Sequence, residues 1–256
     1  MAIYAISDLH LSFGENKPMD VFGVNWEKHT EKIRENWLSK VTENDLVLLP
    51  GDFSWATYLK DTYMDFQYLS SMPGKKILLK GNHDYWWTSL KKMREYLEEN
   101  NFKNIDFLHN NSYEFENKII VGTRGWQDEN TKEDKNIIKR EILRLELSIQ
   151  DGIKKYGKEK EIIVCMHYPP FNRFEEIEFS FINVMKKYNI TKCIYGHLHG
   201  ENSHKEAKEG LIEEIEFKLV SCDYTKFNLI KIWKQCLYYC NKDTVFIFLF
   251  NCWNKS

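Results

Sequence analysis

Short apolar runs alternate with helical patterns through the first hundred residues of the chain. The runs Ala2 to Ser7, Asp45 to Leu49 and Lys76 to Leu79 have the length and composition of buried strands. Each precedes a segment with apolar residues at helical spacing: Ile33, Trp37 and Val41 within a helix expected over 26–41, then Leu59, Tyr63 and Phe66, then Leu90, Met93 and Leu97. This order predicts βαβ units around a largely parallel sheet that is buried on both faces.

The remainder of the chain is more varied. Strands are expected over 105–108, 113–115, 119–122, 162–166 and 192–195, with antiparallel or mixed pairing for the first three because Asn-rich turns join them. Helices are expected over 131–156 and 178–188, and the alternating runs 212–220 and 228–232 predict a closing hairpin. With 256 residues and no repeat or linker, we expect one α/β domain over 1–232, built from two mixed sheets face to face with helices outside both.

Composition excludes several functional classes. The 36 Lys and Arg and 38 Asp and Glu are interspersed and leave a net charge of −2, which does not favour nucleic acid as a partner, without excluding it. The six cysteines contain no CxxC pair, so reduced thiols in a cytoplasmic protein are expected. We expect no secretory signal, because Asp8 and His10 promptly follow the opening apolar run, and no membrane span, because the apolar run Val245 to Phe250 is too short.

Histidines and carboxylates gather at the predicted strand ends. The segments are Asp8-Leu9-His10, Gly51-Asp52, Gly81-Asn82-His83-Asp84, His167 and Gly196-His197-Leu198-His199. Each follows a predicted strand, and the carboxyl ends of parallel strands meet at the edge where α/β proteins bind ligands. These side chains are therefore expected to meet in one place.

The types and spacing of these residues indicate metal binding. Asp8 and His10 are two residues apart, as are His197 and His199, so each pair can reach one ion from an extended segment. Asp, Asn and His donors without Cys suit Mn, Fe, Zn, Co or Ni, with manganese the first candidate, rather than Cu(I) or an iron-sulfur cluster. Seven candidate ligands are more than the four that a structural zinc site uses, but they suit two ions about 3.5 to 4 Å apart that share a carboxylate. Such a site attracts phosphate.

In this order the five segments resemble the calcineurin-like metallophosphoesterase superfamily, over most of the chain from Ala2 to about Ile232. The resemblance implies a four-layer αββα sandwich with a dinuclear metal site at the carboxyl ends of the strands. It also implies one ion on Asp8, His10, Asp52 and His199 and another on Asp52, Asn82, His167 and His197, with Asp52 as the bridge. By the same resemblance His83 protonates the leaving alkoxide or stabilises the phosphoryl oxygens, and Asp84 either orients His83 or turns the chain.

Departures from relatives narrow the subfamily. Serine/threonine protein phosphatases of this superfamily have an Asp-Arg pair where Trp55 and Ala56 stand. Purple acid phosphatases have a Tyr ligand at the position of Trp55 and lack a His in the first motif, where this chain has His10. Lipid A pathway hydrolases have Arg where His83 is. The remaining resemblance is to small bacterial-type phosphoesterases.

Substrate contacts are assigned to residues that flank the motifs. Arg124 and Arg173 are candidates because a guanidinium matches the geometry of phosphate. Tyr85 and Trp126 could wall the pocket, with core packing as the alternative. His29, His109 and His204 lie outside all motifs and are expected on the surface or in turns.

The expected function is hydrolysis of a phosphate monoester or diester of a small substrate by attack of a metal-bound hydroxide. The alternatives are a phosphodiesterase or nuclease acting on cyclic nucleotides or nucleic acid, and a scaffold without catalysis. The extension over 233–256 has no assigned role. Its apolar run must be buried as an added strand, be covered in a contact between subunits of a homo-oligomer, or be prone to aggregation.

Overall fold

The computed structural model describes residues 1–15, 17–128, 130–171 and 180–235. The strands are β1 (Ala2–Ala5), β2 (Leu46–Leu49), β3 (Lys75–Leu79), β4 (Ile105–Leu108), β5 (Tyr113–Phe115), β6 (Lys118–Thr123), β7 (Glu161–Met166), β8 (Lys192–Tyr195), β9 (Gly210–Ile212), β10 (Ile215–Leu219) and β11 (Ile230–Lys234). The α helices are α1 (His29–Lys40), α2 (Tyr63–Ser70), α3 (Leu90–Glu99), α4 (Lys132–Tyr156), α5 (Phe181–Lys187) and α6 (Gly200–His204). Short 3-10 helices cover Met19–Phe22, Val24–Trp26 and Leu59–Thr62.

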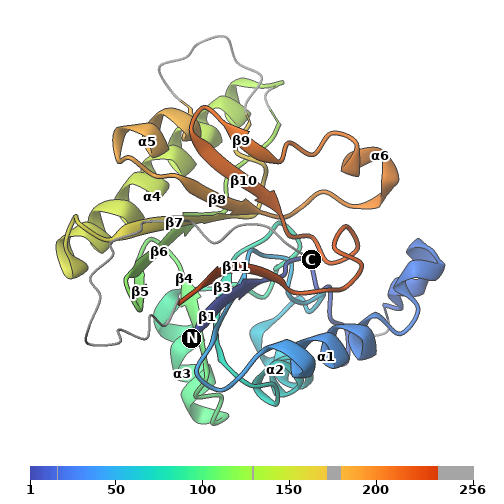
Figure 1. Cartoon of the computed structure of the whole chain (residues 1–256). Helices are drawn as coiled ribbons and strands as arrows, with labels where there is room; N and C mark the ends of the chain where they lie inside the picture. The colour runs from blue at the N-terminus through green and yellow to red at the C-terminus, as the bar shows by residue number, and fades with distance from the viewer. Residues whose placement is uncertain (16, 129, 172–179, 236–256) are drawn as a thin grey trace, which may run out of the picture.

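The strands form two sheets. One has the order β11-β1-β2-β3-β4, and the other has the order β5-β6-β7-β8-β10-β9. Strands β1 to β4 are parallel, as are β6, β7, β8 and β10, while β5, β9 and β11 pair antiparallel with their neighbours. Figure 1 shows the sheets face to face, with α1, α2 and α3 outside one and α4 and α5 outside the other. The expected α/β sandwich of two mixed sheets in four layers is confirmed.

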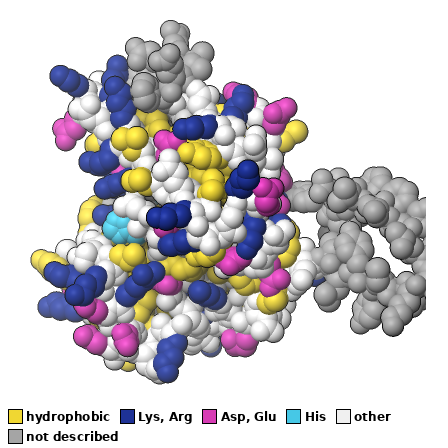
Figure 2. Space-filling model, turned by 90° about the vertical axis from the view of Figure 1, so that its left-hand side faces the viewer, with side chains coloured by type: hydrophobic (Ala, Val, Ile, Leu, Met, Phe, Trp, Pro, Cys, Tyr) yellow, Lys and Arg dark blue, Asp and Glu magenta, His cyan; other side chains and the backbone are white. Residues whose placement is uncertain are grey.

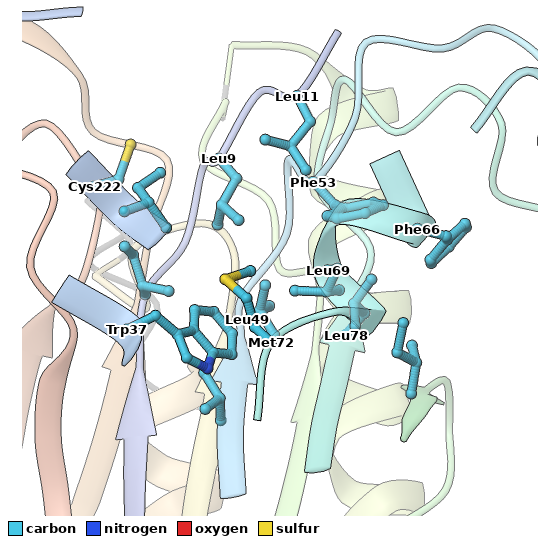
Figure 3. Packing of buried hydrophobic residues seen from close by; sticks show 14 of the residues in the cluster. Leu9, Leu11, Trp37, Leu49, Phe53, Phe66, Leu69, Met72, Leu78 and Cys222 are labelled. Carbon is cyan, nitrogen blue, oxygen red and sulfur yellow. The ribbon is translucent and has the colours of Figure 1, made fainter. Parts of the chain in front are cut away.

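Alternating side chains of each strand enter different core layers. In β2, Leu46 and Leu48 point between the two sheets, where they join Ile77 of β3 and Ile163 of β7. The intervening side chains of β2 pack under the helices, and there Leu49 lies with Leu78, Trp37, Phe66 and Leu69 (Figure 3). Because both faces are covered, each central strand is apolar throughout, which is why the sequence showed continuous apolar runs.

The pairing of the last strands corrects one prediction. The runs 212–220 and 228–232 were expected to form a hairpin, but β10 and β11 belong to different sheets. The hairpin joins β9 to β10 through Glu213 and Glu214, both with positive φ, as a two-residue turn requires. Since β8 and β9 occupy both sides of β10, β11 pairs with the free side of β1 instead.

The middle strands divide between the sheets. β4 extends the parallel pairing of β3, whereas β5 and β6 form the expected antiparallel pair in the other sheet. Helix α5 begins after its capping residue Ser180, so the first residues of the helix expected over 178–188 lie outside the described residues. The apolar run of the C-terminal extension also lies outside them.

The charged side chains and the cysteines are arranged as the sequence predicts. On the face drawn in Figure 2, Lys and Arg side chains are scattered among acidic ones. Cys165, Cys193 and Cys222 are buried free thiols. Among the helices that the structure describes, none has the length and apolar character needed to cross a bilayer.

Helix α4 is fixed to the second sheet by apolar contacts and by one buried hydroxyl. Thr131 and Asp134 form a capping box at its start, and Leu145 and Ile149 are buried against β6 and β7. The Ser148 hydroxyl accepts a hydrogen bond from the Gly122 amide at 3.0 Å and donates one to the Asn111 carbonyl at 2.6 Å. Removing this hydroxyl takes from the Gly122 amide and the Asn111 carbonyl the side-chain hydrogen bond that each makes with Ser148.

We expect Ser148→Ala to lower the free energy of unfolding by about 2 kcal/mol, because the buried Gly122 amide and the half-buried Asn111 carbonyl each lose a hydrogen bond. Urea unfolding measures the loss as a lower midpoint at an unchanged slope. Ser39→Ala is the control: its exposed hydroxyl bonds to a carbonyl of its own helix, and the loss should stay below about 0.5 kcal/mol. Equal effects of the two substitutions would contradict this account of α4.

Candidate functional site

The five sequence motifs follow β1, β2, β3, β7 and β8 directly and meet at one edge of the sandwich. The backbone there departs from strand geometry. Asp8, His10, Asp52 and His197 have φ of 62°, 46°, 52° and 74°. Positive φ is uncommon for residues with side chains and is retained where the surroundings enforce it, commonly at functional sites.

Four of the expected ligands form one compact group. Asp8, His10, Asp52 and His199 each present a donor atom, and these atoms lie within 4.8 Å of one another. The His199 Nε2 atom is 3.2 Å from Asp8 Oδ1 and 3.3 Å from His10 Nε2, and His10 Nε2 is 3.8 Å from Asp52 Oδ2. This is the set that the family resemblance assigned to the first ion.

The other three expected ligands lie beside this group. Asn82 Oδ1 is 2.7 Å from His167 Nε2 and 2.9 Å from His197 Nδ1. His167 Nε2 is also 3.5 Å from Asp52 Oδ2, so Asp52 lies between the two groups of donors. The Pro50 carbonyl, 2.9 Å from His167 Nδ1, fixes the orientation of that ring.

Two glycines make room for the carboxylates. A Cβ atom on Gly196 would lie 2.6 Å from Asp8 Oδ2, and one on Gly81 would overlap the Asp52 carboxylate. Any larger residue at either position would displace a donor oxygen. This explains the Gly that precedes Asn82 and the Gly that precedes His197.

The electrostatics of the group suit a bound cation. Burial lowers the pKa of His167 to about 3 and that of His197 to about 4, so both imidazoles are neutral and free to donate a lone pair. Burial raises the pKa of Asp52, and the nearby Asp84 and Asp8 charges raise it further. Burial opposes the charge on His199, but Asp8 and Asp223 raise its pKa to about 10, so a proton neutralises the buried carboxylate.

The donor set therefore fits divalent metal ions. A divalent ion among Asp8, Asp52 and the neutral histidines would relieve the repulsion between the carboxylates. The buried His10 Nδ1 has no hydrogen-bond partner among the described residues, leaving that ring held by its neighbours alone. Oxygen and imidazole donors without sulfur suit the borderline divalent metals.

Asp84 supports the site without touching His83 through its carboxylate. It is fully buried and accepts hydrogen bonds from the amides of Asp52, Phe53, Ser54 and Gly81 and from the Trp86 indole. Of the two roles that sequence analysis left open, these bonds match the shaping of the chain. The catalytic assignment of Asp84 stays a prediction.

His83 lies at the rim of the ligand group. Its amide donates a hydrogen bond to Asp52 Oδ1 at 2.8 Å, and its ring centroid is 5.6 Å from that of His10. The centroid of the Trp55 ring lies 4.5 Å from that of the His83 ring. The same Trp55 ring stacks on His10 with a centroid distance of 4.8 Å. Tyr85, 61% exposed, meets the outer side of His83 edge to face, so it is placed at the mouth of the site.

Sequence analysis missed Asp223. Its Oδ1 atom is 3.0 Å from His199 Nδ1, its Oδ2 accepts a hydrogen bond from the Gly200 amide at 2.9 Å, and His204 Nε2 lies 3.2 Å from Oδ2. A carboxylate in this position fixes the ring of a ligating histidine. The available signal was its place four residues after β10, another strand ending at this edge.

Two of the three histidines outside the motifs are placed differently from expectation. His204 lies against Asp223 rather than on a free surface. His29 is buried between Trp26 and Phe227, so a surface role is wrong for it. Packing around β1 and α1 covers it, which a single sequence does not reveal.

The remaining substrate candidates have separate outcomes. Arg124 lies at the end of β6, half-buried, with its guanidinium 5.1 Å above the Trp126 ring. The Trp126 indole donates a hydrogen bond to Asp134 at 3.1 Å and packs against the core, so that ring braces α4. Arg173 lies outside the described residues.

We expect Asp223→Asn to weaken Mn²⁺ binding about 10- to 100-fold, because His199 loses its carboxylate support. Equilibrium titration monitored by calorimetry measures the affinity. Asp106→Asn, which removes a carboxylate paired with Arg94 near the surface, should leave it unchanged. An Asp223→Asn protein with wild-type affinity would show that Asp223 does not orient a ligand.

Comparison with known proteins places this geometry in a family. No curated protein sequence matches the chain. The structure is similar to TT1561 of Thermus thermophilus at 12% identity, with a TM-score of 0.56 over 90% of this chain and 96% of that one. It also matches AQ665 of Aquifex aeolicus, a protein of unknown function, at 19% identity and a TM-score of 0.47 over 90% and 95%. A sequence model of the calcineurin-like phosphoesterases matches residues 1–201, and the chain belongs to that family.

Proposed function

We propose that the protein hydrolyses a phosphate monoester or diester with the help of two divalent metal ions. The observation that carries this proposal is the meeting of Asp8, His10, Asp52 and His199 donor atoms within 4.8 Å of one another. Membership of the calcineurin-like phosphoesterases supports the same reaction class. A scaffold without catalysis would have no need for this strained and buried set of donors.

Asp52 would be shared between the two ions. Asp8, His10 and His199 would complete the first site, and Asn82, His167 and His197 would complete the second, as their proximity allows. Bound divalent ions neutralise charge on the phosphoryl oxygens and lower the pKa of water. Manganese is the first candidate because the set mixes carboxylate, amide and imidazole donors.

His83 is the residue assigned to the leaving group. Burial lowers its pKa, and the His199 charge lowers it further, so the ring is neutral before substrate arrives. Its Nδ1 atom is buried without a hydrogen-bond partner among the described residues. A phosphate dianion beside the ring would raise its pKa and favour the protonated form, which can then give a proton to the departing oxygen.

We expect Asp52→Asn to abolish turnover of p-nitrophenyl phosphate almost completely and to reduce the metal content from about two ions per chain. In EDTA the variant should be at least as stable as the wild type, since a buried carboxylate repelled by Asp84 and Asp8 is removed. Elemental analysis, steady-state rates and thermal melting measure the three quantities.

Asp106→Asn serves again as the matched control. A variant that keeps two ions and full turnover would refute Asp52 as the bridge. A wild-type protein with substoichiometric metal after reconstitution, and no turnover of the monoester or of bis(p-nitrophenyl) phosphate, would favour the scaffold.

We expect His83→Gln to slow hydrolysis of an alkyl phosphate about 100- to 10,000-fold, the usual contribution of general acid catalysis. The effect on p-nitrophenyl phosphate should be much smaller, because p-nitrophenolate leaves without a proton. The ratio of kcat/KM values for the two esters is the measurement, at unchanged metal content. An equal loss for both esters would assign His83 to phosphoryl-oxygen stabilisation instead.

A further inference from the structure

A cavity of about 380 Å³ opens beside the ligand group at the ends of β3, β4 and β6. Helix α4 forms its outer wall through Arg140, Glu141 and Arg144. Its inner wall includes Lys80 after β3, His109 after β4 and Arg124 after β6. No motif in the sequence pointed to this cavity, because its residues are far apart along the chain.

The cavity holds more positive than negative charge. Lys80, Arg124, Arg140 and Arg144 line it, and Glu141 is the one carboxylate among the lining residues. Glu141 is 1% exposed, with Oε1 2.6 Å from Arg144 Nη1 and 3.6 Å from Arg140 Nε. Its Oε2 accepts a hydrogen bond from the Thr123 hydroxyl at 2.6 Å, so this carboxylate is engaged and the two arginines of α4 are held over the cavity.

The remaining two cations, Lys80 and Arg124, have no carboxylate partner among the residues that the structure describes. Within the described residues, neither Lys80 nor Arg124 forms an ion pair, and the buried Arg124 Nε has no hydrogen-bond acceptor. Both side chains are half-buried. Partly desolvated cations that lack an anionic partner are costly, and an anion from solution would satisfy them.

His109 adds a neutral donor. The Trp87 indole N–H points to His109 Nδ1 at 3.3 Å, which assigns the ring proton to Nε2. Burial lowers the pKa of His109, and the charges of Arg144 and Lys80 lower it further. The lowered pKa agrees with a concentration of positive charge in the cavity.

Loops that line the cavity also carry expected ligands or are bonded to loops that carry them. Lys80 stands two residues before Asn82 on the same loop. In the parallel pair of β6 and β7, Thr123 is opposite Met166, so Arg124 comes level with His167. The Tyr168 amide donates a hydrogen bond to the Arg124 carbonyl at 2.9 Å, which ties the two loops together. One small molecule could therefore contact both regions.

We propose that this cavity binds a second phosphate group of the substrate while the ester to be cleaved lies at the ligand group, so that the substrate class is small bisphosphorylated molecules. The inference rests on the proposed phosphoesterase function. Several guanidinium and ammonium donors around one engaged carboxylate suit a doubly charged phosphate better than a single carboxylate. The scattered charge over the rest of the chain favours a small ligand over a nucleic acid.

The test compares esters that differ only in the second phosphate. Diol bisphosphates from ethanediol to hexanediol are assayed against alkyl monophosphates of the same chain length, with Mn²⁺-loaded protein and phosphate release as the readout. We expect kcat/KM at least about tenfold higher for one or more of the bisphosphates, mainly through KM. The double variant Lys80→Met and Arg144→Met should remove this preference.

The matched control removes two cations elsewhere. The double variant Lys186→Met and Lys187→Met removes the same number of positive charges as the cavity variant, but on α5, where these side chains pair with Glu213 and Glu146. This variant should keep the preference for bisphosphates. A second measurement without metal is calorimetric binding of pyrophosphate to the protein in EDTA, which the cavity variant should weaken about tenfold and the α5 variant should not.

The outcomes separate this inference from the proposed function. Monophosphates that are hydrolysed as well as every bisphosphate would overturn the inference and leave the phosphoesterase intact. A wild-type protein that releases phosphate from none of these esters would overturn both. Pyrophosphate binding that is equal in the wild type and the cavity variant would also overturn the assignment of the cavity.

Discussion

The geometry of the ligand group depends on the carboxylate of Asp84. This side chain collects amide hydrogens from the loops after β2 and β3, so that Asp52, Asn82 and His83 have fixed relative positions. The loop after β1 is added to them by hydrogen bonds from the Asp8 and His10 amides to the Gly51 and Asp52 carbonyls. Burial raises the pKa of the Asp84 carboxyl, and its five hydrogen bonds offset part of the cost of burying the charge. The same loops without Asp84 would present several unpaired amides in the core.

That arrangement explains why the ligand residues tolerate unfavourable surroundings. Asp52 is buried near the charges of Asp84 and Asp8, and burial lowers the pKa of His10, His167 and His197. Such a cluster lowers the stability of the fold in the absence of a cation. Binding energy from metal ions would offset that cost, since ligand binding to the native state adds directly to the free energy of unfolding.

The sequence predicts the parts of the structure that follow from local pattern. Apolar runs located the strands from β1 to β8, and the motifs at their ends located the seven expected ligands, because parallel strands bring their carboxyl ends together. The partner of β11 could not be predicted, since an alternating strand fits any open sheet edge. Asp223 was missed because its place after a strand was the one available signal, and a single aspartate in a loop matches no metal-ligand spacing. The role of Asp84 needed three-dimensional contacts, because the amides that it binds are mostly about thirty residues away in the chain.

The two electrostatic regions at this edge impose an order on binding. Before metal arrives, the ligand group contains buried carboxylates, the neutral imidazoles of His167 and His197, and a His199 imidazolium that Asp8 and Asp223 already engage. A phosphate dianion would therefore find little positive charge to pair with there. The neighbouring cavity is positive without any bound ion, because Lys80 and Arg124 are part of the chain itself. A bisphosphate could therefore be held by the cavity at any time, but its other phosphate can enter the ligand group only after cations have reversed the charge there. Metal loading would thus precede productive binding, and a substrate held by the cavity alone would stay intact.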